Sequence, residues 1–177
     1  MRLMRLLSES TCEHEVFFDL DGVLADFDSQ IERFFHQEPN AFWDSRGHKE
    51  AWSVIKNIGA EFWIDMGLMP GSKQLWSYVK QSGCLSGIIT APPKPSNIDM
   101  SYIKQVMKWK TQWVRNHWGS ERVLFAYSGT KGKFAKPNRI LIDDMDKNLT
   151  EWKNKGGIPV EFDNAQSVIK KLQSMGV

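Results

Sequence analysis

The chain has 177 residues, of which 41% are hydrophobic and 25% charged, a composition typical of a soluble globular protein with one core. Its formal net charge of +2 is too small to predict a polyanionic partner such as a nucleic acid. No apolar run is long enough to span a membrane, so no membrane association is expected. The two cysteines, Cys12 and Cys84, match no paired metal-ligand spacing, which favours reduced thiols in a cytosolic protein.

The N-terminal stretch from Met1 to Leu7 carries two arginines and several leucines. It lacks the apolar core and the cleavage pattern of a signal peptide. We therefore expect a frayed start rather than a short leader, and a cytoplasmic protein.

Short apolar runs alternate with helical patterns along the rest of the chain. A helix is predicted over 72–81, a second from Tyr102 to near Gly119, and a third at the C-terminus with Asp163 as its N-cap. Strands are predicted over 16–20, 85–90, 123–126, 139–143 and 159–162. This alternation implies an α/β fold with a parallel sheet and right-handed crossovers.

The most informative segment is the first predicted strand, Val16–Leu20, with the residues that follow it. Asp19 and Asp21 are two positions apart, so they lie on the same side of an extended strand. Like charges held so close repel, which indicates either a bound cation or one protonated carboxyl. Mg²⁺ favours oxygen ligands of this kind and usually retains waters and a substrate phosphate. The alternative is an ordinary Asp-Gly turn after a strand.

Polar residues also end two other predicted strands. These residues are Thr90, Asp143 and Asp144. Ligands bind at the carboxyl ends of parallel strands, so these side chains should converge with the two acids of the first strand. Three lysines lie just upstream of the last acidic pair, namely Lys131, Lys133 and Lys136. The ordered set predicts a site for phosphate and magnesium.

These segments resemble the four motifs of the haloacid-dehalogenase-like phosphohydrolases. The matching positions are Asp19–Asp26, Ile88–Thr90, Lys133 and Ile142–Asp144. The resemblance implies a Rossmann-like core with a five-stranded parallel sheet of order 5-4-1-2-3 and a small helical cap inserted after the first strand. It divides the chain into a core, residues 1–27 and 69–177, and a cap, residues 28–68.

More narrowly, the chain is similar to the 5'(3')-deoxyribonucleotidases. This similarity rests on Val23–Phe27, on Leu68–Gly71, on the spacing between Lys133 and Asp143, and on Phe-Trp pairs between the first two motifs. It implies a Mg²⁺-dependent phosphomonoesterase that removes phosphate from deoxyribonucleoside monophosphates. The expected partner is thus a small nucleotide, and the resembled enzymes also suggest a homodimer.

The resemblance assigns a role to each acid. Asp19 would be the nucleophile that forms an aspartyl-phosphate, and Asp21 would act as general acid and then general base. The implied metal ligands are Asp19, Asp21 through its backbone carbonyl, Asp143 and Asp144. Since successive strand residues face opposite ways, only one of the last two should touch the ion, and the resemblance favours Asp144.

The phosphate would be held by Thr90 and by Lys133, the lysine that the spacing favours among the three. The backbone after Thr90 would contribute as well, but Ala91 stands where some of these enzymes have a second hydroxyl, and the two prolines that follow have no N–H. Lys110 resembles a phosphate-contacting lysine, although a solvated helix charge is an equal alternative.

The predicted cap is rich in aromatic residues, for which packing within its own core is the default interpretation. Nucleobases also stack on aromatic faces, and the resemblance places a base and deoxyribose pocket here. The matching candidates are Phe27, Phe42, Trp43 and Trp63.

Two rival functions remain open at this point. One keeps the chemistry but acts on another small phosphate ester or on the end phosphate of a nucleic acid. The other is a nucleotide-binding module without turnover, against which the intact pair Asp19 and Asp21 argues.

Overall fold

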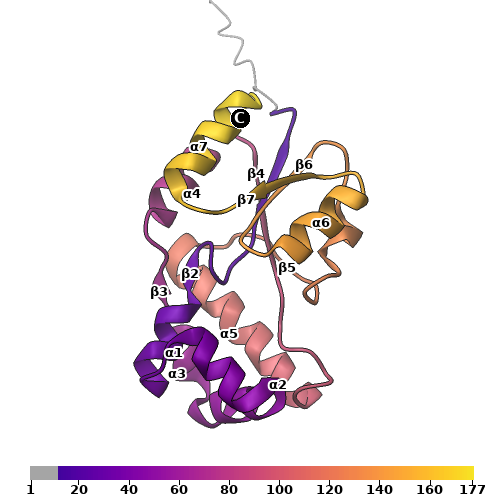
Figure 1. Cartoon of the computed structure of the whole chain (residues 1–177). Coiled ribbons are helices and arrows are strands. Elements are labelled where there is room, and N and C mark those ends of the chain that lie inside the picture. The colour runs from indigo at the N-terminus through magenta and orange to yellow at the C-terminus, as the bar shows by residue number, and fades with distance from the viewer. Residues whose placement is uncertain (1–11) are drawn as a thin grey trace, which may run out of the picture.

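The computed structural model describes residues 12–177, so the stretch from Met1 to Leu7 lies outside the described residues (Figure 1). Five strands form one sheet in the order β5-β4-β1-β6-β7, and every neighbouring pair is parallel. The strands are β1 (Glu15–Phe18), β4 (Leu85–Thr90), β5 (Val123–Phe125), β6 (Arg139–Asp143) and β7 (Ile158–Glu161). The parallel α/β sheet expected from the sequence is therefore confirmed.

The strand labels differ from the expected order 5-4-1-2-3 because two short strands, β2 (Ala25–Asp26) and β3 (Gly67–Leu68), lie outside this sheet. With only the five sheet strands numbered along the chain, the sheet reads 3-2-1-4-5, which is 5-4-1-2-3 from its other edge. The strand that carries the first acids is the central one in either numbering.

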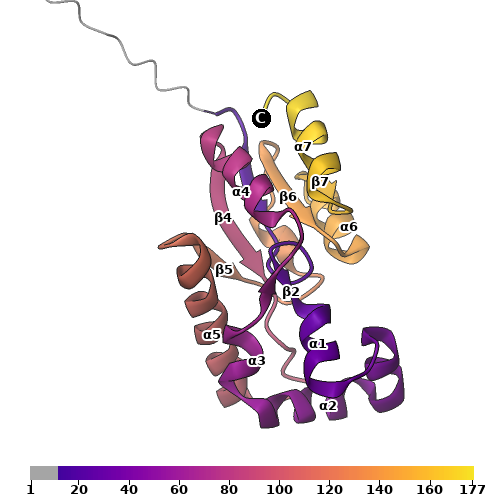
Figure 2. The ribbon, with the colours of Figure 1, turned by 90° about the vertical axis from the view of Figure 1, so that its left-hand side faces the viewer.

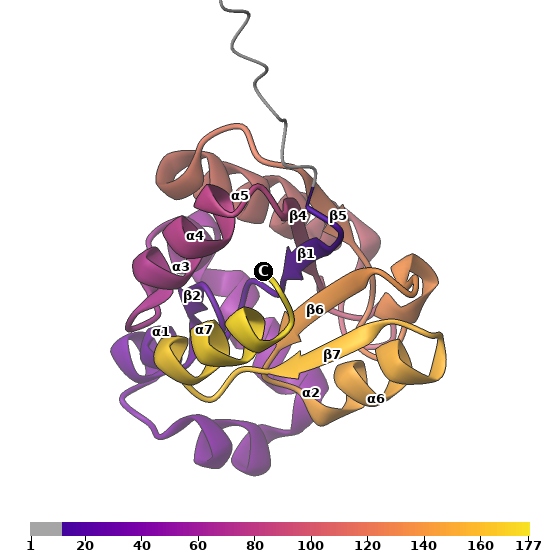
Figure 3. The same cartoon turned by 90° about the horizontal axis from the view of Figure 1, so that it is seen from above.

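Helices cover both faces of the sheet, which explains why its strands are mostly apolar. Along β1, Phe17 packs against Trp152 of α6 (Asp146–Asn154), whereas Val16 and Phe18 face the opposite core. Two helices that pack against each other contribute to this opposite core, α4 (Ser72–Gln81) and α7 (Ala165–Ser174). Leu75 of α4 is one of its buried residues. Figure 3 shows α6 and α7 on opposite sides of β7.

The C-terminal helix begins one residue later than predicted. Asn164, not Asp163, is its N-cap, because the Asn164 side chain accepts a hydrogen bond from the backbone N–H of Ser167. Asp163 accepts a hydrogen bond from the Asn164 N–H instead.

Between β1 and α4 the chain forms three helices, α1 (Phe27–Phe35), α2 (Pro39–Ile58) and α3 (Ala60–Ile64). The antiparallel pair β2 and β3 marks where the chain enters and leaves this segment. The long helix α5 (Met100–Trp118) packs against α3, and the Trp63 indole N–H donates to the Tyr102 hydroxyl over 3.0 Å. Figure 2 shows the three helices and α5 together at one end of the molecule.

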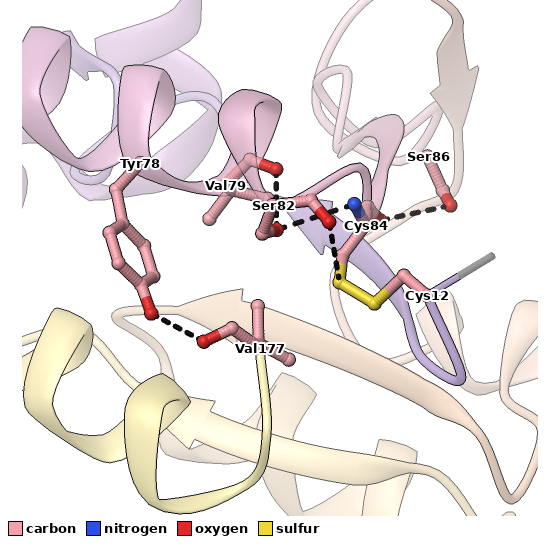
Figure 4. Close-up of a disulfide and its surroundings, with 7 residues drawn as sticks. All are labelled: Cys12, Tyr78, Val79, Ser82, Cys84, Ser86 and Val177. Carbon is pink, nitrogen blue, oxygen red and sulfur yellow. Dashed lines mark hydrogen bonds between the residues drawn. A yellow bond between two sulfur atoms is a disulfide. The ribbon is translucent and has the colours of Figure 1, made fainter. Parts of the chain in front are cut away.

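The two cysteines form a disulfide, so the expectation of reduced thiols is wrong. Cys12 and Cys84 are 72 positions apart in sequence, yet their Cα atoms are 5.1 Å apart. Because β1 and β4 are parallel neighbours, the residues that precede both strands meet at the same edge of the sheet (Figure 4). This proximity is a property of the strand order and has no local sequence signal.

Among residues 12–177, every helix is too short or too polar to cross a lipid bilayer.

Candidate active site

The acids at the ends of the two central strands converge. Oxygen atoms of the Asp19, Asp143 and Asp144 carboxylates lie within 4.8 Å of one another. They meet because β1 and β6 are parallel neighbours with Phe18 opposite Ile142, so the two strands end at the same edge of the sheet. The Asp21 carboxylate is not part of this cluster, so any role for Asp21 as a metal ligand is left to its backbone carbonyl.

The lysine that enters the cluster is Lys131, and the prediction of Lys133 is wrong. The Lys131 ammonium is fully buried, 2.7 Å from an Asp19 oxygen and 2.6 Å from an Asp143 oxygen. Lys133 is exposed, and its ammonium lies over the Phe134 ring. The segment Lys131–Phe134 is a 3₁₀ helix, in which residues two positions apart point about 120° apart around the axis. Spacing along the sequence alone could not select the inward residue.

Asp143 and Asp144 have different environments. Asp143 is fully buried, and its two oxygens accept hydrogen bonds from Lys131, from the Asn148 amide and from the Met145 N–H. Asp144 is exposed to a large cavity and lacks the lysine and asparagine donors that hold Asp143. This difference favours Asp144 as a direct ligand and gives Asp143 the task of orienting Lys131.

Asn148 was not predicted from the sequence. It is 1% exposed, donates to both oxygens of Asp143, and accepts from the Gly129 N–H over 2.9 Å. It lies on α6, so it ties the helix to the end of β6 and to the loop before the 3₁₀ helix. The only sequence signal for this role was the position of Asn148, five residues after Asp143 and near the start of a helix.

The electrostatics of the cluster suit a divalent cation. Three carboxylates meet one ammonium, which leaves two negative charges in excess. Although Asp144 opens onto the cavity, the protein around it displaces much of its solvent, and this desolvation raises the pKa of Asp144 to about 7; the neighbouring charges of Asp19 and Asp143 add to the effect. Burial alone would lower the pKa of Lys131, but those same two carboxylates outweigh it and raise the pKa. Clustered carboxylate oxygens of this type are the donor set that Mg²⁺ prefers, so the residues present fit this ion.

Gly22 allows Asp144 to approach the first strand end. Its φ of +77° lies in the left-handed region, where side chains are strained. A Cβ at this position would also overlap with the Asp144 carboxylate. The Asp-Gly pair is therefore more than a turn, because the missing side chain makes room for an acid of the cluster.

A second ion pair holds Asp21. The Lys110 ammonium pairs with the Asp21 carboxylate and also donates to the Thr90 hydroxyl over 3.1 Å and to the Ala91 carbonyl over 2.8 Å. Lys110 is 1% exposed, so the alternative of a solvated helix charge is wrong. Burial raises the pKa of Asp21, and Lys110 partly offsets that shift. The other oxygen of Asp21, Oδ1, is buried without a hydrogen-bond partner.

Thr90 and Ala91 lie at the end of β4 as expected, but they differ in access. Thr90 is fully buried behind the Lys110 ammonium, whereas Ala91 lines the cavity. Phosphate binding by these two residues remains a prediction.

A cavity of about 680 Å³ opens beside the acids. Asp19, Asp21 and Asp144 form part of its lining, and the loop from Ala91 to Asn97 forms another part. The aromatic part consists of Phe27, Trp43, His48 and Trp52. The cavity therefore combines a charged region with a flat apolar one.

Two of the four predicted aromatic candidates do not reach this cavity. Phe42 is fully buried and Trp63 is 1% exposed, and both pack inside the core rather than at the cavity wall. Trp63 still lies near the site, since the Lys110 ammonium is 5.3 Å from the centre of its ring.

Trp52 also lines the cavity and was not among the predicted residues; a kink in α2 brings it there. It lies nine positions after Trp43, which in a regular helix places the two side chains about 180° apart. Gly47 has non-helical angles, φ 70° and ψ 164°, and kinks the helix between them. The rings of Trp43 and Trp52 consequently lie 5.2 Å apart on the same cavity wall.

The sequence matches no protein-family model and no curated protein. Solved structures do match. A dehalogenase aligns with a TM-score of 0.57 and 10% identity, over 96% of this chain and 98% of its own. A haloacid dehalogenase-like hydrolase from Streptococcus pneumoniae aligns with a TM-score of 0.51 and 12% identity, over 93% and 98%.

A phosphatase is also similar. The D,D-heptose 1,7-bisphosphate phosphatase from Burkholderia thailandensis aligns with a TM-score of 0.50 and 10% identity, over 91% of this chain and 99% of its own. At such low identity these alignments establish the architecture and leave the chemistry to the residues of the site. The described part of this chain has the fold of the haloacid dehalogenase-like hydrolases.

Proposed function

We propose that this protein is a Mg²⁺-dependent phosphomonoesterase that acts on deoxyribonucleoside monophosphates, as the 5'(3')-deoxyribonucleotidases do. The observation that carries the proposal is the cluster of Asp19, Asp143 and Asp144 around Lys131, beside a cavity walled by aromatic rings. The fold, shared with hydrolases that include a phosphatase, supports the same class of reaction.

Asp19 is the proposed nucleophile. It lines the cavity, and a carboxylate oxygen that attacks phosphorus displaces the ester oxygen and forms an aspartyl-phosphate. Lys131 stabilises the charge that develops on the phosphoryl group, since its buried ammonium already lies 2.7 Å from Asp19. A bound Mg²⁺, held by Asp19 and Asp144, would supply further charge stabilisation.

Asp21 is the proposed acid and base. Asp21 lines the cavity, and its carboxyl group would give a proton to the leaving ester oxygen and later take one from the water that hydrolyses the aspartyl-phosphate. Lys110 fixes one oxygen and therefore the orientation of the carboxyl group. This arrangement is more than a binding module requires, because binding alone needs no oriented proton donor.

The aromatic wall supports a nucleotide rather than a sugar phosphate as the substrate. Trp43, Trp52 and Phe27 offer flat faces of the kind on which nucleobases stack. In this proposal residues 28–68 serve as the cap, which excludes water from the reaction and holds the leaving nucleoside.

A phosphate-release screen tests the proposal. The protein should release phosphate from deoxynucleoside monophosphates faster than from sugar phosphates or end-phosphorylated oligonucleotides, and only with Mg²⁺. Asp19→Asn should abolish release while the far-ultraviolet circular dichroism spectrum is unchanged. Asp65→Asn, at an exposed position after α3, is the matched control and should retain full activity. Activity retained by Asp19→Asn would reject the assigned nucleophile, and nucleotide binding without release would favour a binding module.

A further inference from the structure

The disulfide lies at the edge of the sheet opposite the acids. Cys12 comes three residues before β1, and Cys84 comes one residue before β4, whereas Asp19 and Thr90 lie at the other ends of these strands. The Val16 N–H donates to the Cys84 carbonyl over 2.8 Å, so the two strands are already paired at this point. Backbone hydrogen bonds therefore join the two strands at this point in addition to the cross-link.

The two cysteine residues are unequally exposed. Cys84 is 2% exposed, and its backbone is fixed on both sides, since its N–H donates to the Ser82 hydroxyl and its carbonyl also accepts from Ser86 (Figure 4). Cys12 is only partly buried and precedes the first strand. Of the two residues, Cys12 is therefore the more exposed side of the disulfide.

We propose that Cys12 is a site of thiol–disulfide exchange, through which low-molecular-weight thiols control the stability of the protein. A glutathione thiolate attacks the Cys12 Sγ, the S–S bond breaks, and the Cys84 sulfur leaves with the electron pair and takes a proton from water. A second thiolate then attacks the mixed disulfide on Cys12 and releases oxidised glutathione. Two protein thiols form as two glutathione molecules are oxidised, and oxidised glutathione reverses the sequence.

The structural consequence is a change in stability. The disulfide closes a loop of 72 positions that contains β1, the helices α1 to α3 and α4. Closing so long a loop restricts the unfolded chain, so reduction should stabilise the unfolded state more than it alters the folded one. Cys84 keeps its backbone partners after reduction, so the strand ends that carry the acids should not move.

The test needs no enzymatic activity, so its outcome is independent of the proposed function. The oxidised protein, unfolded under non-reducing conditions, should contain no free thiol and should weigh two hydrogen atoms less than the reduced chain. In glutathione buffers of decreasing redox potential, the melting temperature should fall by about 10 °C as the thiols appear. Mixed disulfides trapped by rapid alkylation should map to Cys12 rather than Cys84.

Cys12→Ser is the matched control, because it removes the cross-link in every buffer. It should melt at the temperature of the reduced wild type and show no further change with glutathione. Two free thiols in the protein after oxidation would overturn the proposal, as would mixed disulfides on Cys84 alone. An equal effect of glutathione on Cys12→Ser would overturn it too. If this variant does not fold, the wild-type titration still decides between these outcomes.

Discussion

The buried lysine of the acidic cluster gives the sharpest prediction. Replacing Lys131 by Met keeps an unbranched side chain of similar length and removes the charge. The ammonium is fully buried between Asp19 and Asp143, at 2.7 and 2.6 Å, so its loss leaves two buried carboxylates without their counter-charge. Breaking a buried ion pair in this way typically costs about 3–5 kcal/mol.

We expect a value near the lower end, about 3 kcal/mol, because Asp143 retains the hydrogen bonds from Asn148 and Met145. For a chain of this size each kcal/mol lowers the melting temperature by about 2–4 °C, so the expected drop is about 6–12 °C. The proposed reaction should slow by roughly 10²–10³-fold, since one preorganised positive charge near the phosphoryl group is lost.

Lys133→Met is the matched control. It makes the same substitution two residues away, at an exposed position whose ammonium lies over the Phe134 ring. Its effect on the free energy of unfolding should stay within about 0.5 kcal/mol.

The assay is urea unfolding of both variants in buffer with EDTA, followed by the same measurement with Mg²⁺. Without the cation the Lys131 variant should be much less stable than the Lys133 variant. With Mg²⁺ it should regain more stability than the wild type does, because the cation meets more uncompensated charge. Equal unfolding curves for the two variants in EDTA would refute the assignment of Lys131 as the central cation of the cluster.

Two further predictions concern the room for Asp144 and the aromatic wall. Gly22→Ala places a Cβ against the Asp144 carboxylate and should reduce the stabilisation of the protein by Mg²⁺ in thermal melts, while Gly156→Ala, with a similar φ of +86° but open space, should not. Equal Mg²⁺ responses of the two glycine variants would contradict a role for Gly22 in this approach. Trp52→Ala should raise KM for deoxynucleotides by roughly 5–150-fold, the equivalent of about 1–3 kcal/mol of stacking, and leave a sugar phosphate unaffected. An equal rise in KM for both substrates would show that Trp52 stabilises the fold rather than stacking on the base.

Local patterns predicted most of the fold. The strands 85–90 and 139–143 and the helix 72–81 have the bounds that the alternation of apolar residues and the flanking Pro-Gly turn indicated. The convergence of Asp19, Asp143 and Asp144 also followed, since parallel strands carry their carboxyl ends to one edge. Such features depend on a few adjacent residues or on one general rule of sheet topology.

The errors about which side chains enter the site share a different cause. Whether Lys131 or Lys133 points inward depends on the 3₁₀ turn that carries them, and whether Trp52 joins Trp43 depends on the kink at Gly47. The burial of Phe42 likewise depends on which helix face packs inward. In each case the direction of a side chain decides the outcome. A shift of one or two residues in helical phase reverses that direction.

The sequence by itself determined the alternating α/β architecture and the identity of the acids, because these depend on periodicity and on residue type at strand ends. Only the tertiary structure decided which lysine neutralises the acids, which aromatic rings face the cavity, and that Cys12 meets Cys84. These outcomes depend on contacts between segments far apart in the chain, and such contacts are fixed when the sheet and its helices pack together. No local pattern encodes them.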